Sequence, residues 1–249
     1  MVDQTAPQQS PEPGLALSRL WDAPAAHGAP RPGPRPRLSL SAIVDAAVAA
    51  ARAEGLSAVT MARVAQDAGC AKMALYRHVS GHRDLLSAML DDTLGGPPKA
   101  VGSWRERFLT LWEALLDVYA RDPWLLELPS DTPGLTPRNV AWIDTALSLF
   151  AGSTLPTAER LNTVLLITEN IRFEARRRRA GSDSVNDLAH LFSSASRASG
   201  DLPAEQFPHL VAVAGSAPSG GEAPSRGPDH VRDLILRSIA AYFPEKGAP

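Results

Sequence analysis

A stretch of twenty residues, 60–79, constrains the fold of this chain more than any other part; it reads TMARVAQDAGCAKMALYRHV. Thr60 can cap a first helix through its hydroxyl, and Gly69 can take the positive φ of a tight turn after it. A second helix then starts at once, with Leu75 and Val79 one turn apart on its inner side. Its outer side and leading end carry Lys72, Met73, Ala74, Tyr76 and Arg77. The spacing predicts two short helices crossed over a turn, a helix-turn-helix.

The charge of the residues around this motif indicates which kind of partner it binds. The outer face of such a second helix fits the major groove of DNA, which admits one α-helix. Helical hairpins that bind no DNA also have small residues and a glycine at the turn. Residues 35–83 contain seven Lys or Arg and three acids, a local charge of +4, whereas the whole chain carries −2. Positive charge is concentrated where a polyanion would dock, and this favours DNA binding.

The flanks of the motif extend the pattern over residues 38–90. The segment includes a run into Glu54-Gly55-Leu56, the Thr60 cap, Val64-Ala65, Ala68-Gly69, Leu75-Tyr76, His78-Val79 and the opening Leu85-Leu86 of the next helix. It resembles the DNA-binding domain of the tetracycline-repressor (TetR) family of bacterial transcriptional regulators. The segment departs from the family in two respects: His82 stands where lysine is frequent at a phosphate contact, and the outward Met73 and Ala74 are weak base readers. The operator sequence therefore cannot be derived from these residues.

The motif, its charge and the resemblance together predict which residues contact double-stranded DNA. The predicted DNA-binding residues are Arg37, Thr60, Arg63, Lys72, Met73, Ala74, Tyr76, Arg77, His78 and His82. Thr60 and His82 stand at helix starts, where phosphate can be held. Arg37 ends a basic segment, RPGPRPR at 31–37, that either reaches the minor groove and phosphates as an arm or is a solvated linker.

The first 36 residues differ in composition from the rest. They hold eight of the 22 prolines, which disfavours helix, so we predict a disordered tail over 1–36. Four apolar residues within it, Leu15, Leu17, Leu20 and Trp21, either dock on the body or stay loosely ordered, and we expect the second. The helix-turn-helix domain should span 37–96, because GGPP at 95–98 breaks any continuing helix.

Helical spacing recurs throughout both predicted domains, and no convincing alternating strand appears, so the predicted fold class is all-α. In the first domain, helices should run from Ser39 or Ser41 to Glu54 and over 83–94 around the motif. A larger helical domain, 100–245, holds 12 of the 14 aromatic residues. Helical spacing runs through Phe108, Leu111, Trp112, Leu115 and Tyr119 up to Asp122-Pro123, and again through Ile143, Leu147 and Phe150 after the loop at 129–137. Further helices are expected over 156–179, 185–199, 201–214 and 231–242, with a flexible loop at 215–228. The order of these helices is similar to the ligand-binding and dimerisation domain of TetR-like proteins.

Large rings and mid-helix polar residues in the second domain suggest a binding site for a hydrophobic small molecule. The candidate ligand-binding residues are Trp112, Tyr119, Trp142, Glu169, Asn170 and Phe173. The alternative is an ordinary aromatic core in which Asn170 bonds to the backbone or faces water. The arginines at 176–179 either bind nucleic acid or form a solvated helix end, and the second reading is favoured.

Other chemistry has little support in the sequence. The single cysteine, Cys70, excludes an intrachain disulfide, and no run of apolar residues approaches the roughly 20 needed to span a bilayer. The start lacks the features of a secretory signal, so we expect a cytoplasmic protein. No nucleotide-binding loop is present, and a metal site from His78, His82 and Cys70 is disfavoured. We therefore predict no cofactor, no metal and no enzymatic activity.

The resulting hypothesis is a DNA-binding transcriptional regulator. As a repressor, it would bind a palindromic operator as a homodimer and be released by a small-molecule effector. The apolar stripe of 231–242 should pair with the 156–179 helix and with their copies about a two-fold axis. The alternative is a small-molecule-binding protein or enzyme that retains the helix-turn-helix as an interaction surface, and activator and repressor cannot be told apart by sequence.

Overall fold

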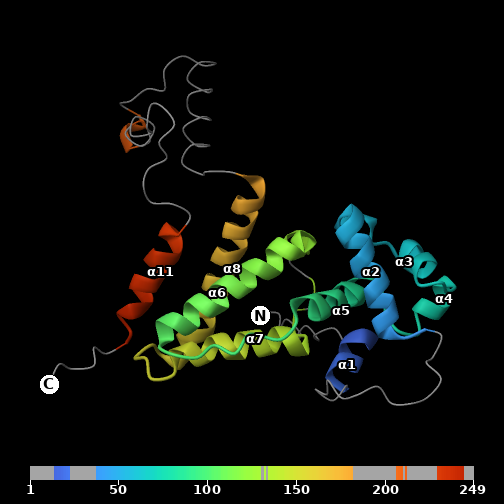
Figure 1. Ribbon diagram of the computed structural model, residues 1–249, viewed down its shortest axis with the longest axis horizontal. Helices are drawn as coiled ribbons and strands as arrows, with labels where there is room; N and C mark the ends of the chain where they lie inside the picture. The colour runs from blue at the N-terminus through green and yellow to red at the C-terminus, as the bar shows by residue number, and fades with distance from the viewer. Residues whose placement is uncertain are drawn as a thin grey trace, which may run out of the picture. The chain divides into compact units, whose positions relative to one another are not determined.

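The computed structural model describes residues 14–22, 38–129, 132, 134–181, 206–209, 211 and 229–243 (Figure 1). Every regular element among these residues is a helix, in agreement with the predicted all-α class. Two compact units are formed, one from Met1–Pro97 with Arg121–Thr145 and the other from Pro98–Ala120 with Ala146–Pro249. Arg37, the helix expected at 185–199 and the loop expected at 215–228 lie outside the described residues.

The first unit contains the predicted helix-turn-helix and its flanking helices. These are α2 (Leu40–Glu54), α3 (Met61–Asp67), α4 (Lys72–Leu75) and α5 (His82–Leu94), with a short 3₁₀ turn, η1 (Leu56–Ala58). Ser39 caps α2, its Oγ accepting the N–H of Ala42 at 3.1 Å, and Gly55 ends the helix at a φ of 87°. Both boundaries of this helix agree with the sequence prediction.

The core of the first unit is made by buried residues of α2, α3, α4 and α5 and of the turn before α5. Its fully buried members include Ile43, Ala47, Val64, Leu75, Val79, Leu85 and Met89. Each large side chain buried in this way stabilises the fold by about 1.5–3 kcal/mol relative to exposure. The short α3 and α4 are therefore held by packing, since isolated helices of this length are unstable in water.

The predicted tail contains a helix that the sequence analysis did not expect. Residues Leu15–Asp22 form α1, which packs against α5, with Ala16 and Leu17 buried (Figure 1). The prediction of disorder over 1–36 is thus wrong for this segment, because its apolar residues have a surface to bury against. The remaining tail residues, 1–13 and 23–36, lie outside the described residues.

The segment 121–145, assigned from sequence to the second domain, belongs to the first unit. It holds a 3₁₀ helix, η2 (Pro123–Glu127), and most of α7 (Pro137–Leu147). The Nε of Arg52 lies 2.6 Å from Oδ1 of the fully buried Asp122. The indole of Trp142 donates to the carbonyl of Gly95 at 3.1 Å. These polar contacts across long sequence separations account for the difference from the predicted domain boundary.

The longer elements of the second unit, among the residues that the structure describes, are three helices and a short turn. They are α6 (Trp104–Arg121, of which Arg121 counts with the first unit), η3 (Ser148–Phe150), α8 (Thr157–Ala180) and α11 (His230–Ala240). The rings of Trp104 and Phe243 stack at a centroid distance of 4.4 Å. The carbonyl of Tyr242 accepts the N–H of Thr154 at 2.7 Å, so the end of α11 is fixed on the loop before α8. None of the helices described is long and apolar enough to cross a membrane.

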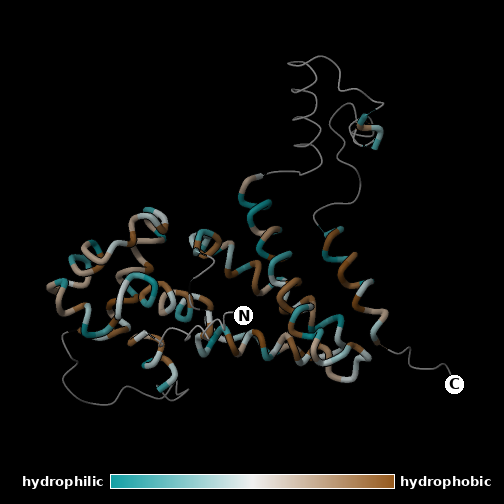
Figure 2. Tube along the Cα trace, turned by 180° about the vertical axis from the view of Figure 1, so that it is seen from behind, coloured by the Kyte–Doolittle hydropathy of each residue, from teal (hydrophilic) through white to brown (hydrophobic). Residues whose placement is uncertain are grey.

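The apolar residues of α8 are divided between buried and exposed positions. Val164, Ile167, Ile171, Glu174 and Ala175 are buried, whereas Leu161 and Leu165 are about half exposed. In Figure 2, hydrophilic colour marks the last turns of α8, where the arginines lie. Part of the apolar surface of α8 therefore remains exposed in the described chain.

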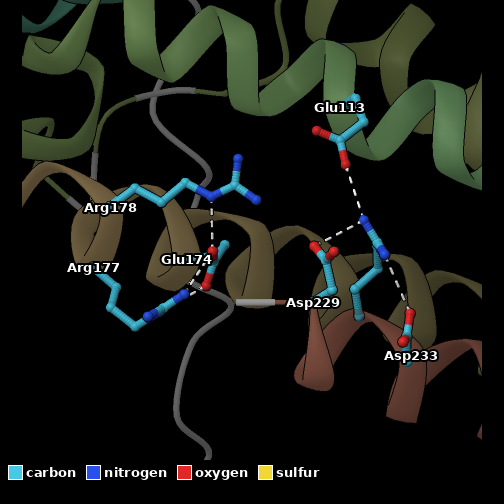
Figure 3. A network of polar contacts seen from close by, with 7 residues as sticks. Glu113, Glu174, Arg177, Arg178, Asp229 and Asp233 are labelled. Atoms are coloured by element: carbon cyan, nitrogen blue, oxygen red, sulfur yellow. Dashed lines mark hydrogen bonds and ion pairs between the residues drawn. The ribbon is translucent and has the colours of Figure 1, made fainter. Parts of the chain in front are cut away.

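Ion pairs hold the polar end of α8 and connect α11 with α6 (Figure 3). The buried carboxylate of Glu174 accepts from Arg177 and Arg178 at 2.8–2.9 Å. Burial alone would raise the pKa of Glu174, but the bonds from the two arginines lower it overall. Arg232 of α11 pairs with Glu113 of α6 at 3.2 Å and with Asp229 at 3.0 Å. The arginine run 176–179 therefore has a structural role in at least two of its members.

Candidate DNA-binding surface

The geometry of the helix-turn-helix follows from its caps and its inward residues. Thr60 caps α3, its Oγ1 accepting the N–H of Arg63 at 3.2 Å, and Gly69 turns the chain at a φ of 65°. Leu75 and Val79 are fully buried and fix the inner side of α4, as predicted. The backbone stays helical in character after Leu75, since the N–H of His78 donates to the carbonyl of Leu75 at 2.9 Å. These contacts fix which side of α4 faces solvent.

The outer side of α4, and of the turn at 76–78 that continues it after the helix ends at Leu75, carries the predicted recognition residues. Met73 is 77% exposed and Tyr76 38% exposed, while Lys72 and Arg77 are also exposed and Ala74 is half-buried. Two cations, a phenol and a thioether thus share one convex face. Such a face can give hydrogen bonds to phosphates and base edges, and apolar contact to thymine methyl groups.

The two histidines of the motif region differ in their surroundings. The Nε2 of His82, at the start of α5, donates to the carbonyl of Val59 at 2.7 Å, which ties α5 to the residue before α3. His78 follows α4, is half-buried, and lies 2.9 Å through Nδ1 from Nη1 of Arg19. Burial first, and then the charges of Arg19 and Arg77, lower the pKa of His78 below its ordinary value. His78 is therefore kept neutral at pH 7.

Arg63 is engaged within the protein. Its Nη2 lies 2.9 Å from Glu54 and its Nε 2.7 Å from Asp67. Hydrogen bonds to Glu54 and then to Asp67 raise the pKa of Arg63. An arginine held by two carboxylates must give up those partners to bind DNA, so its predicted DNA contact requires rearrangement.

The residues that form this surface match a known family model. Residues 43–89, from within α2 to within α5, match the model for bacterial regulatory proteins of the tetR family. Residues 43–89 are thus similar to a TetR-type DNA-binding domain. One relative, the HTH-type transcriptional repressor DrrR1 of Streptomyces coeruleorubidus, is 34% identical over 126 residues, or 49% of this chain and 47% of the repressor. The matched part of the chain spans about half the length of this curated relative.

Solved structures extend the likeness to most of the chain. ActR of Streptomyces coelicolor, a TetR family protein in complex with (S)-DNPA, has a TM-score of 0.62 at 25% identity, covering 83% of this chain and 96% of ActR. The transcriptional regulator SCO7222 of the same organism has a TM-score of 0.57 at 22% identity, covering 83% and 99%. The likeness therefore includes the second unit as well as the helix-turn-helix.

The six residues proposed to bind a small molecule are divided between the two units. Trp142 lies in the first unit; Trp112 and Tyr119 of α6 are buried in the second. The other three lie on α8, where Glu169 and Phe173 are exposed and Asn170 is half-buried. The amide of Asn170 donates to the carbonyl of Leu166 at 2.8 Å, one turn earlier. The backbone bond expected for Asn170 in the alternative interpretation is thus present.

Tyr119 has the most distinctive environment among these six residues. Burial raises the pKa of Tyr119, and charged groups of α8, Arg172 and Glu169 among them, act on its hydroxyl. Arg172 and Glu169 themselves pair at 3.4 Å. The polar part of α8 therefore faces the hydroxyl of a buried tyrosine, which gives this region both apolar and charged groups.

Two residues close to the DNA-binding surface were not identified from sequence. Arg19 of α1 contacts His78, and the buried Asp84 of α5 accepts the N–H of Ser80 at 2.7 Å. The Ser80–Asp84 spacing before an apolar run could have indicated a helix cap. No local pattern predicts the contact of Arg19, because 59 residues separate it from His78.

Proposed function

We propose that this protein is a transcriptional repressor that binds a palindromic DNA operator and is released from it by a small-molecule ligand. The observation that carries the proposal is the convex face of α4, where Lys72, Met73, Tyr76 and Arg77 are exposed. Buried Leu75 and Val79 hold that face outward. The description of DrrR1 as a repressor supports this direction of regulation.

The proposed operator contacts are of two kinds. Arg77 and Tyr76 read base edges or the adjacent backbone, while Lys72, His78, His82 and the N-terminus of α3 at Thr60 hold phosphates. Arg37 and Arg63 are also proposed to contact the operator. Arg63 would do so after its ion pairs with Glu54 and Asp67 have been broken. Since helix-turn-helix proteins read one half-site with each motif, two copies are needed for a full operator.

The second copy is proposed to bind through α8 and α11. Seven large apolar side chains on these helices are 36% or more exposed in the single chain: Leu161, Leu165, Leu166, Phe173, Val231, Leu234 and Tyr242. Apolar residues gathered in this way usually mark an interface. A two-fold axis that pairs α8 and α11 with their copies would cover them and match the symmetry of a palindrome.

Release by ligand is proposed for the second unit. The ActR structure with bound (S)-DNPA, similar over most of both chains, supports a small-molecule effector. Trp112, Tyr119, Glu169, Asn170 and Phe173 are its proposed contacts in that unit, and Trp142 is a further candidate. A ligand that binds the DNA-incompetent form better by about 1–3 kcal/mol would weaken operator affinity roughly 5- to 150-fold.

Footprinting of the full-length protein on DNA from upstream of its own gene tests the proposed function. The expected result is one protected near-palindrome at a protein concentration that leaves random DNA unprotected. Hydrophobic and aromatic acids can then be screened for loss of protection, and any hit repeated with Trp112→Ala and Asn170→Ala. If neither the upstream DNA nor any other double-stranded DNA is bound, the helix-turn-helix serves as another kind of interaction surface.

A further inference from the structure

The N-terminal helix α1 is fastened to the start of α5 by one carboxylate. Asp84 accepts the N–H of Ala16 through Oδ2 at 2.9 Å and the N–H of Leu17 through Oδ1 at 3.2 Å. The same carboxylate accepts the N–H of Ser80 at 2.7 Å, and the Oγ of Ser80 accepts the N–H of Leu15 at 2.8 Å. Asp84 therefore satisfies the open N–H groups of α1 and of the turn before α5 together.

Close packing fixes the position of α1 further. A Cβ built at Gly14 would overlap the Asp84 carboxyl group, so glycine is required for the approach. Ala16 is fully buried and Leu17 is 9% exposed. The indole of Trp21 donates to the carbonyl of Leu135 at 3.0 Å at the other end of the helix. With both ends fixed, α1 holds its side chains in defined places on the DNA-binding domain.

Arg19 projects from α1 onto the end of the recognition helix. Its Nη2 donates to the carbonyl of Arg77 at 2.9 Å, and its Nη1 lies 2.9 Å from Nδ1 of His78. A guanidinium has no acceptor, so Nδ1 of His78 must be the unprotonated, accepting nitrogen. The proton of the neutral imidazole is then on Nε2, because the bond made by one ring nitrogen determines the state of the other.

The contact with Arg19 leaves Nε2 of His78 as a hydrogen-bond donor. An imidazole with its proton on Nε2 can donate from that atom to a phosphate oxygen, whereas the other tautomer would present a lone pair and be repelled. We propose that Arg19 is a positioning residue for DNA binding, which holds His78 in the Nε2–H tautomer as a donor to an operator phosphate. The proposal rests on the proposed function, since it requires that His78 meets DNA.

A double-mutant cycle on the full-length protein tests whether Arg19 acts through His78. Arg19→Ala and His78→Ala should each weaken binding to the upstream operator about 3- to 10-fold, the loss of one hydrogen bond. In the double variant the loss should stay within about 2-fold of that of His78→Ala alone. Losses that multiply in the double variant would overturn the proposal, because Arg19 would then contribute independently of His78.

Two further measurements separate positioning from direct contact. The slope of affinity against salt concentration should be unchanged by Arg19→Ala, whereas a direct phosphate contact would lower it by about 1. Gly14→Val, which displaces α1 without altering either side chain, should reproduce the loss caused by Arg19→Ala. A lower salt slope, or a Gly14→Val protein that binds as wild type, would contradict the positioning role.

Nitrogen-15 NMR of the histidine rings in the free protein tests the tautomer without DNA. The resonances of His78, assigned by their loss in His78→Ala, should indicate a protonated Nε2 in the wild type and a mixture of tautomers in Arg19→Ala. A protonated Nδ1 in the wild type would overturn the proposal. If the protein binds no upstream DNA, the proposed function fails, whereas this measurement still decides whether Arg19 fixes the tautomer.

Discussion

Arg52 holds the buried carboxylate of Asp122 with two parallel bonds, Nε to Oδ1 at 2.6 Å and Nη2 to Oδ2 at 3.1 Å. Asp122 also accepts from Arg121 at 3.0 Å and from the indole of Trp124 at 3.3 Å. The residue that directly follows α6 is therefore fixed to α2, the helix that braces the helix-turn-helix.

Asp122→Asn should destabilise the protein by about 1–3 kcal/mol, because Arg52 and Trp124 lose a charged acceptor at a buried position. Thermal unfolding measures the loss. Asp117→Asn, at an exposed position of the preceding helix α6, is the matched control and should unfold at the wild-type temperature. Equal unfolding temperatures for Asp122→Asn and the control would mean that the Arg52 contact contributes nothing to stability.

The same carboxylate predicts a dependence of stability on pH. Burial alone would raise the pKa of Asp122, but the bonds from Arg52 and Arg121 lower it overall. A carboxyl group whose pKa is lower in the folded than in the unfolded protein stabilises the fold at pH values above its unfolded pKa, which is about 3.9 for aspartate. This stabilisation is lost as the pH falls through the pKa of the folded state. The stability difference between wild type and Asp122→Asn should thus be constant from pH 7 to about 5 and shrink in acid. Urea unfolding at several pH values measures it, and a difference that grows in acid would contradict the assignment.

The docking of α1 should also depend on pH, through the protonation of His78. The pKa of His78 is lowered by burial and then by the charges of Arg19 and Arg77. Protonation of His78 therefore destabilises the state in which α1 is docked. Docking should be unaffected above about pH 6.5 and weaken as pH falls below that value, since Nδ1 can no longer accept from Arg19 once protonated. The indole N–H resonance of Trp21 reports on the docked helix. In His78→Gln, which keeps an acceptor but does not titrate, this resonance should stay constant over the same range.

The exposed apolar residues of α8 and α11 predict the effect of charge on assembly. Leu165→Glu or Leu234→Glu should convert the proposed dimer into monomers, because a carboxylate at an apolar interface loses its hydration without a partner. Light scattering measures the mass. Val101→Glu, at a residue 81% exposed outside these helices, is the control and should leave the mass unchanged. If the variants of both helices remain dimeric, the interface lies elsewhere on the protein.

Sequence reasoning predicted the features of the first unit that depend on local chemistry. The caps Ser39 and Thr60, the turn at Gly69 and the inward Leu75 and Val79 all follow from residue type and spacing. These features determine the outward face of α4, so the composition of the candidate recognition surface could be predicted without coordinates.

What the sequence missed depends on contacts between distant residues. The docking of α1 requires Gly14 beside Asp84, and the placement of 121–145 requires Asp122 beside Arg52. Periodicity also could not decide which side of α8 is buried, because apolar residues line more than one of its faces. Which side is covered by the subunit's own core and which remains exposed is a property of the assembled unit.

The most direct test of the account is a fluorescence-anisotropy titration of the full-length protein, Arg77→Ala and the control Lys99→Ala on the upstream DNA. Wild type and Lys99→Ala should bind with two protomers per near-palindrome, and scrambling one half-site should weaken that binding at least about tenfold. Arg77→Ala should lose about 1–3 kcal/mol on the intact site and much less on random DNA. Equal affinity of the wild type for intact, half-scrambled and random DNA would contradict the claim that the face of α4 reads an operator.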